Sequence, residues 1–276
     1  MKRFLWTGLL GVSCACYAGG SRQSNSLWHD LGVSTSHHLL LAAVTPGAKG
    51  AVGKGDPEVV ATLQPGKMLS RTAAGDTGMT YQVYVPTTFK ANTATPVIIA
   101  FSPGGNGKQM VNAMKDSAEK VGWLLVGCDK LKNGMSDDRL QMKMEDEVLA
   151  DIFGKLPFDP KRVYFAGFSG GAMRSYELSA RRKEKFAGII AYGGWLGGQE
   201  NQRKPFCNGM AVAQVNGEKD AAANSWADRD ADALKKRKCR VKKFSFPGAH
   251  ALPPADVTDK SIAWLEEDWK KYGSKR

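Results

Sequence analysis

The chain has 276 residues, of which 42% are hydrophobic and 24% charged, so it has the composition of a globular protein rather than of a disordered or fibrous one. No apolar run approaches the length of about 20 residues that spans a bilayer, so no membrane span is expected. The formal net charge is +12. Much of this excess lies in residues 235–243, which we interpret as the end of a surface helix followed by an edge strand, and we expect no nucleic-acid partner.

The N-terminus has the layout of an export signal. Lys2 and Arg3 precede an apolar run at residues 4–12, and small residues follow as far as Ala18. This order predicts a signal peptide at residues 1–18 and a mature chain in the periplasm or outside the cell. The alternative is a buried N-terminal helix.

After the signal, the sequence divides into two parts. Residues 19–66 are rich in Gly, Ser, Ala and Pro without periodicity and predict a linker or loosely ordered arm. Residues 67–276 alternate short apolar runs with helical patterns and predict one domain with a mostly parallel sheet covered by helices on both faces. About eight strands are expected, at residues 68–73, 81–85, 96–101, 123–127, 163–166, 186–192, 210–215 and 240–246.

One of these strands leads into a candidate nucleophile. The strand at 163–166 runs into Gly167-Phe168-Ser169-Gly170-Gly171, and a helical pattern follows. Glycines on both sides of a serine allow the tight strand-to-helix turn that projects the hydroxyl from the sheet. Ser169 is therefore the predicted nucleophile of a hydrolase.

Candidates for the base and the acid follow two later strands. Three of the four histidines lie in the first 38 residues, which leaves His250 as the candidate base. Asp220 follows the strand at 210–215 and is the candidate acid, although Glu218 lies two residues away and an aspartate there can also cap a helix. The order Ser, Asp, His at successive strand ends is that of the α/β-hydrolase fold.

With these motifs the chain resembles a known family. Phe158-Asp159-Pro160-Lys161-Arg162-Val163-Tyr164 before the serine, Gly217-x-x-Asp220, and Gly248-x-His250 before a terminal helix resemble the α/β-hydrolase esterases grouped with secreted polyhydroxybutyrate depolymerases, feruloyl esterases and acetylxylan esterases. The resemblance runs from about residue 80 to 269 and implies Ser169 as nucleophile, Asp220 as acid and His250 as base.

The loop expected to complete the oxyanion hole departs from that family. The family usually has His-Gly after its third strand, whereas this chain has Ser102-Pro103-Gly104-Gly105. Proline has no amide hydrogen, so we expect Gly104 or Gly105 to assist Gly170 as the second donor. Trp195, just beyond another strand, is a candidate for lining the substrate pocket.

The cysteines are interpreted in the light of export. Cys14 and Cys16 lie in the signal region, and a lipid anchor there is not expected because the preceding residues match a lipobox poorly. We expect a disulfide between Cys207 and Cys239, which stand at the starts of two neighbouring strands, and a free Cys128. No cofactor is implied, and one histidine without a Cys-x-x-Cys pair predicts no metal site.

The sequence therefore predicts a secreted serine hydrolase that cleaves carboxylic esters, either short-chain or linked to a polysaccharide, through an acyl-enzyme. The expected partner is an ester substrate, which can be polymer-linked, and the protein is expected to be a monomer. Two alternatives remain open, namely a serine peptidase of the same superfamily and a catalytically weak or dead hydrolase fold that serves as a binding module.

Overall fold

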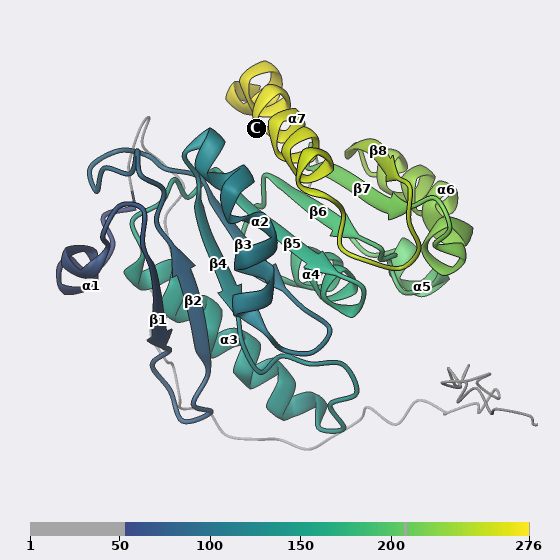
Figure 1. Cartoon of the computed structure of the whole chain (residues 1–276). Helices are drawn as coiled ribbons and strands as arrows, with labels where there is room; N and C mark the ends of the chain where they lie inside the picture. The colour runs from purple at the N-terminus through teal and green to yellow at the C-terminus, as the bar shows by residue number, and fades with distance from the viewer. Residues whose placement is uncertain (1–52, 207–208, 276) are drawn as a thin grey trace, which may run out of the picture. The chain divides into compact units, whose positions relative to one another are not determined.

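The computed structural model describes residues 53–206 and 209–275, and these form an eight-stranded sheet flanked by helices (Figure 1). The strand order is β1-β2-β4-β3-β5-β6-β7-β8. The strands are β1 Met68–Thr72, β2 Thr80–Tyr84, β3 Val97–Phe101, β4 Leu124–Cys128, β5 Val163–Phe168, β6 Gly188–Tyr192, β7 Ala211–Gly217 and β8 Arg240–Phe246. All eight predicted strands are present, each within a few residues of its expected bounds.

Strand direction determines where the loops meet. β1 and β2 form an antiparallel hairpin, and β2 is also antiparallel to β4. Every other neighbouring pair, from β4 to β8, is parallel. The carboxyl ends of β3 to β8 therefore lie along one edge of the sheet, which is where open α/β sheets bind their ligands.

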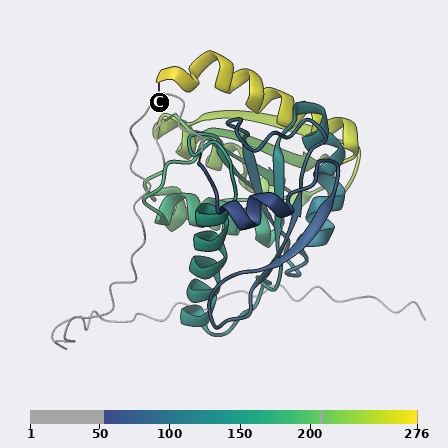
Figure 2. The ribbon, with the colours of Figure 1, turned by 90° about the vertical axis from the view of Figure 1, so that its left-hand side faces the viewer.

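Helices cover both faces of the sheet, as the sequence predicts. On one face α1, α3, α4 and α6 contribute buried residues to one apolar cluster, and on the other α2 and α7 contribute to a second. Figure 2 shows α7 and α3 on opposite sides of the strands. The helices are α1 Pro57–Thr62, α2 Gly107–Val121, α3 Asp138–Lys155, α4 Gly170–Arg181, α5 Gln199–Gln202, α6 Ala221–Lys236 and α7 Ala255–Tyr272.

The expected arm is described only in its last part, and that part is structured. The amide of Gly53 donates to the Phe158 carbonyl, and α1 follows with Asp56 as its N-cap. Val59 and Leu63 are buried in the core, so this segment packs on the domain instead of linking to it. The predicted signal peptide and residues 19–52 lie outside the described residues.

In the part of the chain that the structure describes, no helix has both the length and the apolar character needed to cross a membrane. The same residues contain no group of three or more His, Cys, Asp or Glu side chains that could hold a metal ion.

Candidate active site

Ser169 lies in the sharp turn between β5 and α4. Its backbone has φ 54° and ψ −120°, a conformation that residues other than glycine rarely adopt. Its amide donates to the Tyr192 carbonyl at 2.8 Å, and its own carbonyl accepts from the Ala172 amide at 2.9 Å. These bonds hold the strained residue between the neighbouring strand β6 and the first turn of the helix.

The glycines around Ser169 allow three close approaches. A Cβ on Gly167 would overlap the backbone of Gly171, and a Cβ on Gly171 would overlap the carbonyl of Phe101 on β3. A Cβ on Gly170 would overlap the side-chain amide of Asn133. The first two positions keep α4 against the sheet, whereas the third admits a side chain from the loop after β4.

The structure brings Ser169, His250 and Asp220 together from three strand ends. His250 Nε2 lies 2.9 Å from Ser169 Oγ, and His250 Nδ1 lies 2.7 Å from Asp220 Oδ2. A carboxylate can only accept, so Nδ1 carries the proton and Nε2 is free to accept from the hydroxyl. The three side chains have the contacts that nucleophile, base and acid need.

Asp220 makes one contact with a helix start and one with His250, and its role as the acid stays a prediction. Its Oδ1 accepts from the amide of Ala223 at 3.1 Å and caps α6, while Oδ2 contacts His250. The side chain is 2% exposed. Glu218, the competing acid, is exposed, and the structure gives the histidine contact to Asp220.

The loops that carry Asp220 and His250 hold each other in place. The amide of Glu218 donates to the Phe246 carbonyl, and that of Lys219 donates to the Gly248 carbonyl at 2.8 Å. The imidazole of His250 also packs on the ring of Phe168, with 4.9 Å between ring centroids. His250 is therefore oriented by Phe168 at the end of β5 and by Asp220 at the start of α6, although its side chain is 43% exposed.

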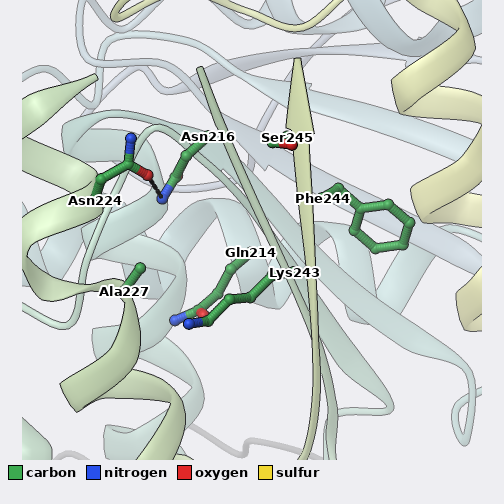
Figure 3. A pocket seen from close by; sticks show the side chains of 7 residues that line it. All are labelled: Gln214, Asn216, Asn224, Ala227, Lys243, Phe244 and Ser245. Carbon is green, nitrogen blue, oxygen red and sulfur yellow. Dashed lines mark hydrogen bonds between the residues drawn. The ribbon is translucent and has the colours of Figure 1, made fainter. Parts of the chain in front are cut away.

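A pocket of about 260 Å³ lies between α6 and strands β7 and β8 (Figure 3). Within it Asn216 Nδ2 donates to Asn224 Oδ1, and Asn224 Nδ2 donates to the Gly217 carbonyl at 2.9 Å. These bonds support the turn that carries Asp220. None of the three candidate catalytic residues lines the pocket.

The predicted oxyanion residues lie at the same edge of the sheet. The Gly105 amide is directed to the Ser102 carbonyl at 3.3 Å, and Gly104 pairs with Lys132 in an isolated bridge. Among the described residues, the amides of Gly104 and Gly170 have no hydrogen-bond acceptor. The geometry thus favours Gly104 over Gly105 as the partner of Gly170.

Trp195 lies in the segment that leaves β6, and its side chain is half-buried. Directly before it, Gly194 passes so close to the nucleophile turn that a Cβ there would be 2.9 Å from the Ser169 carbonyl oxygen. The placement beside the turn is consistent with a pocket role, which remains a prediction.

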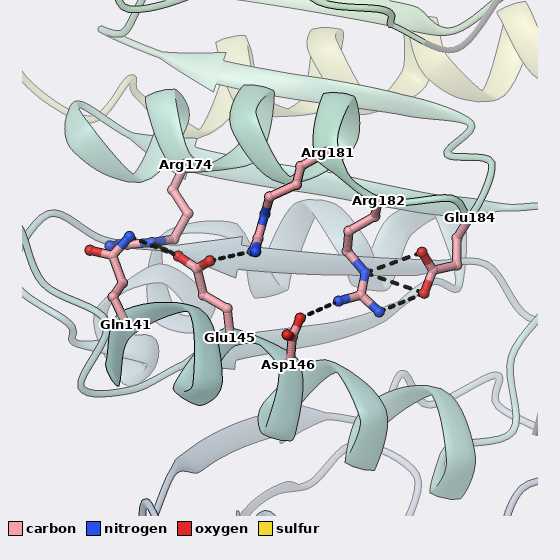
Figure 4. Close-up of polar contacts among 7 residues, drawn as sticks. All are labelled: Gln141, Glu145, Asp146, Arg174, Arg181, Arg182 and Glu184. Carbon is pink, nitrogen blue, oxygen red and sulfur yellow. Dashed lines mark hydrogen bonds and ion pairs between the residues drawn. The ribbon is translucent and has the colours of Figure 1, made fainter. Parts of the chain in front are cut away.

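Two residues near the site, Arg174 and Asn133, are not among those that the sequence predicts. Arg174 on α4 donates to Glu145 on α3 and to the Leu131 carbonyl in the loop after β4, both at 2.9 Å (Figure 4). Asn133 in that loop lies against Gly170. The polar sequence after β4 is the feature that could have indicated Asn133. No sequence feature near Arg174 predicts that its side chain is buried.

The strand order, the flanking helices and the parallel strands from β4 to β8 are those of the α/β-hydrolase fold. Residues 135–261 match the sequence model of the phospholipase/carboxylesterase family, and this segment contains Ser169, Asp220 and His250. The chain thus resembles the esterases of this fold, as the sequence motifs indicated. The comparison with curated protein sequences gives no match.

Solved structures agree on the fold. Est1E from Butyrivibrio proteoclasticus aligns with a TM-score of 0.56 and 15% identity over 73% of this chain and 99% of its own. An S-formylglutathione hydrolase from Agrobacterium tumefaciens gives 0.57 and 14% over 75% and 97%. A Pyrobaculum calidifontis esterase gives 0.58 and 14% over 75% and 87%.

Proposed function

We propose that the protein is a serine hydrolase that cleaves carboxylic esters through Ser169, His250 and Asp220. The observation that carries this proposal is the continuous contact from Ser169 Oγ through the imidazole to the buried Asp220 carboxylate, with distances of 2.9 and 2.7 Å. The similarity to structures described as an esterase and an S-formylglutathione hydrolase supports acyl transfer to water as the reaction class.

The proposed reaction has two halves. His250 Nε2 takes the proton of Ser169 Oγ as the oxygen attacks the ester carbonyl, and then gives it to the leaving alcohol. Asp220 keeps the imidazole in the required tautomer and stabilises its charged form. Water then attacks the acyl-serine with the same help from His250, which releases the acid and restores the hydroxyl.

The oxyanion formed in each half would lie against backbone amides. Gly170 at the start of α4 and Gly104 in the loop after β3 have amides with no acceptor among the described residues. One such donor accounts for about 10²- to 10³-fold in rate. Because both amides belong to fixed turns, they need no rearrangement when the charge develops.

We further propose short-chain or polymer-linked esters as substrates, and export of the mature chain. In many lipid-cleaving α/β-hydrolases a cap is inserted between the strands that correspond to β6 and β7. Within residues 193–206 and 209 of this connection, the structure has only the four-residue helix α5. Such a segment covers little apolar surface, so a long acyl tunnel is not expected.

A labelling experiment and an ester panel test the proposal. A fluorophosphonate probe is expected to label the wild-type protein at Ser169 and not Ser169→Ala. Acetyl and butyryl esters are expected to be cleaved faster than octanoyl esters, with feruloyl esters testing polymer-linked specificity. An unlabelled, inactive wild-type protein would favour a binding module, and amide cleavage above ester cleavage would favour a peptidase.

A further inference from the structure

Asn133 lies between the two halves of the proposed oxyanion hole. Its amide donates to the carbonyl of Pro103 at 2.8 Å, next to the bridge between Gly104 and Lys132. Its side chain occupies the space that a Cβ on Gly170 would need. One residue therefore touches both the loop after β3 and the turn that carries Ser169.

No structural hydrogen bond within the described residues explains the position of the Asn133 side-chain amide. It is exposed, and no hydrogen bond joins it to the residues at 53–206 or 209–275. Rotation about its Cβ–Cγ bond presents either the amide nitrogen or the oxygen to the turn. An amide group with two N–H donors thus stands next to Gly170 without a hydrogen-bond partner among the described residues.

The loop after β3 contains a residue that cannot donate a backbone hydrogen bond. Pro103 takes a place in the oxyanion loop but has no N–H, and the Gly105 amide is turned to the Ser102 carbonyl. Gly104 and Gly170 are two residues of these turns whose backbone amides have no acceptor among the described residues. An asparagine side chain is a competent oxyanion donor when its loop is fixed.

We propose that Asn133 is a catalytic residue whose Nδ2 donates a third hydrogen bond to the oxyanion of the tetrahedral intermediate. The proposal rests on the ester hydrolysis proposed above and adds a residue to that site. The carbonyl oxygen gains negative charge as Ser169 attacks, so the Asn133 bond strengthens in the transition state and lowers its barrier.

The loop that carries Asn133 is fixed by bonds on three sides. Arg174 Nη1 donates to the Leu131 carbonyl at 2.9 Å, and the Lys130 amide donates to the Gly105 carbonyl at 2.7 Å. The Gly107 amide donates to Asp129 Oδ1 at 2.8 Å. A loop held in this way can keep a donor in position before substrate arrives, which is the condition for a large rate effect.

The test compares Asn133→Ala and Asn133→Asp with the wild-type protein on a butyryl ester. Aspartate has the shape of asparagine but, when ionised, lacks a donor and repels the oxyanion. We expect kcat to fall about 10²-fold in Asn133→Ala and at least as far in Asn133→Asp. KM is expected to change by less than about threefold, because the bond is made mainly in the transition state.

Two further measurements separate donation from packing. Binding of an arylboronic acid, which forms a tetrahedral adduct with the nucleophile, is expected to weaken in parallel with kcat/KM. The matched control is Asn92→Ala, an exposed asparagine in the turn before β3, which is expected to leave kcat unchanged. Thermal unfolding of each variant checks that the fold is retained.

The outcomes distinguish this proposal from the one it rests on. A wild-type protein that neither reacts with the fluorophosphonate probe nor cleaves esters overturns both. An active wild-type protein with unchanged kcat in Asn133→Ala overturns only the role of Asn133. Activity that Asn133→Asp retains but Asn133→Ala loses would assign Asn133 to packing, and a rise in KM at constant kcat would assign it to substrate binding.

Discussion

Asp220 divides its two carboxylate oxygens between His250 and the start of a helix. Oδ2 lies 2.7 Å from His250 Nδ1, and Oδ1 caps α6 through the Ala223 amide at 3.1 Å. The Asp220 side chain therefore sets the position of the His250 imidazole relative to α6, and it also fixes the tautomer of that imidazole. A change at Asp220 can separate these two tasks, because asparagine also caps helices but can donate where aspartate only accepts.

Asp220→Asn is expected to lower kcat by about 10⁴-fold, because the amide can stabilise the wrong imidazole tautomer. Thermal stability is expected to stay close to that of the wild-type protein, since the cap is preserved. Glu218→Gln, a change two residues away on an exposed side chain, serves as the control and is expected to keep full activity. If Glu218→Gln is the damaging change, Glu218 and not Asp220 is the acid.

Ser169→Ala and His250→Ala are each expected to reduce ester hydrolysis to the background rate while the fold is retained. Nucleophile and base act as a unit, so the double variant is expected to be little worse than either single one. Steady-state rates and circular dichroism check both statements. Full activity in either variant would exclude the proposed mechanism.

Arg174→Met is expected to lower the free energy of unfolding by about 3–5 kcal/mol, which is typical when one partner of a buried ion pair is removed. The side chains of Arg174 and Glu145 are 7% and 5% exposed, and Arg174 Nε lies 2.9 Å from Glu145 Oε1. Arg181 also contacts Glu145, at 2.6 Å. Burial raises the pKa of Glu145 and the two arginines oppose the rise, so Arg174→Met leaves this buried carboxylate less compensated.

Urea unfolding provides the measurement. The control is Lys260→Ala, which removes the pair with Asp256 on the exposed face of α7, where both side chains are more than 60% exposed. That change is expected to leave the unfolding midpoint unchanged because exposed ion pairs contribute little. If Arg174→Met and Lys260→Ala lower the free energy of unfolding equally, the buried ion pair contributes no more to stability than the exposed one.

A disulfide between Cys207 and Cys239 remains a prediction, since Cys207 lies outside the described residues. The register pairs Ala211 with Arg240, and the Gly209 amide donates to the Lys238 carbonyl at 3.1 Å, so the segments before β7 and β8 meet. Closing a loop of about 33 residues would add roughly 3–4 kcal/mol of stability in the chain-entropy model.

Thiol counting on the exported, denatured protein is expected to find one thiol, that of Cys128. This residue is fully buried, and burial raises the pKa of its thiol, so it is expected to react only after denaturation. Three thiols would contradict the pairing.

The sequence could predict most of the fold because its signals were local. Each buried strand is a short apolar run, and the serine, aspartate and histidine follow strand ends whose order the α/β alternation determines. Helix α3 shows the limit of this reasoning. The buried residues of this helix begin at Met144, whereas the helix begins at Asp138, because Asp137 caps a first turn whose side chains are exposed.

The supporting contacts could not be predicted for a different reason. Arg174 contacts Glu145, which is 29 positions away in the chain, and Gly170 contacts Asn133, which is 37 positions away. No periodic pattern in the sequence relates the members of either pair. An arginine on a helix is usually solvated, so its burial between two helices depends on tertiary packing that sequence spacing does not reveal. For the same reason, the sequence predicts a linker or loosely ordered arm at residues 19–66, although α1 within it packs on the core.

At position 169, reactivity requires a serine, whereas the stability of this backbone conformation favours glycine. A serine with φ 54° is strained by about 1–3 kcal/mol relative to a relaxed conformation, and glycine would adopt the same turn more easily. The folded protein therefore keeps a strained backbone at the position of the proposed nucleophile. Selection for thermal stability alone would favour glycine at position 169. The resulting protein would be more stable to unfolding but would lack the nucleophile.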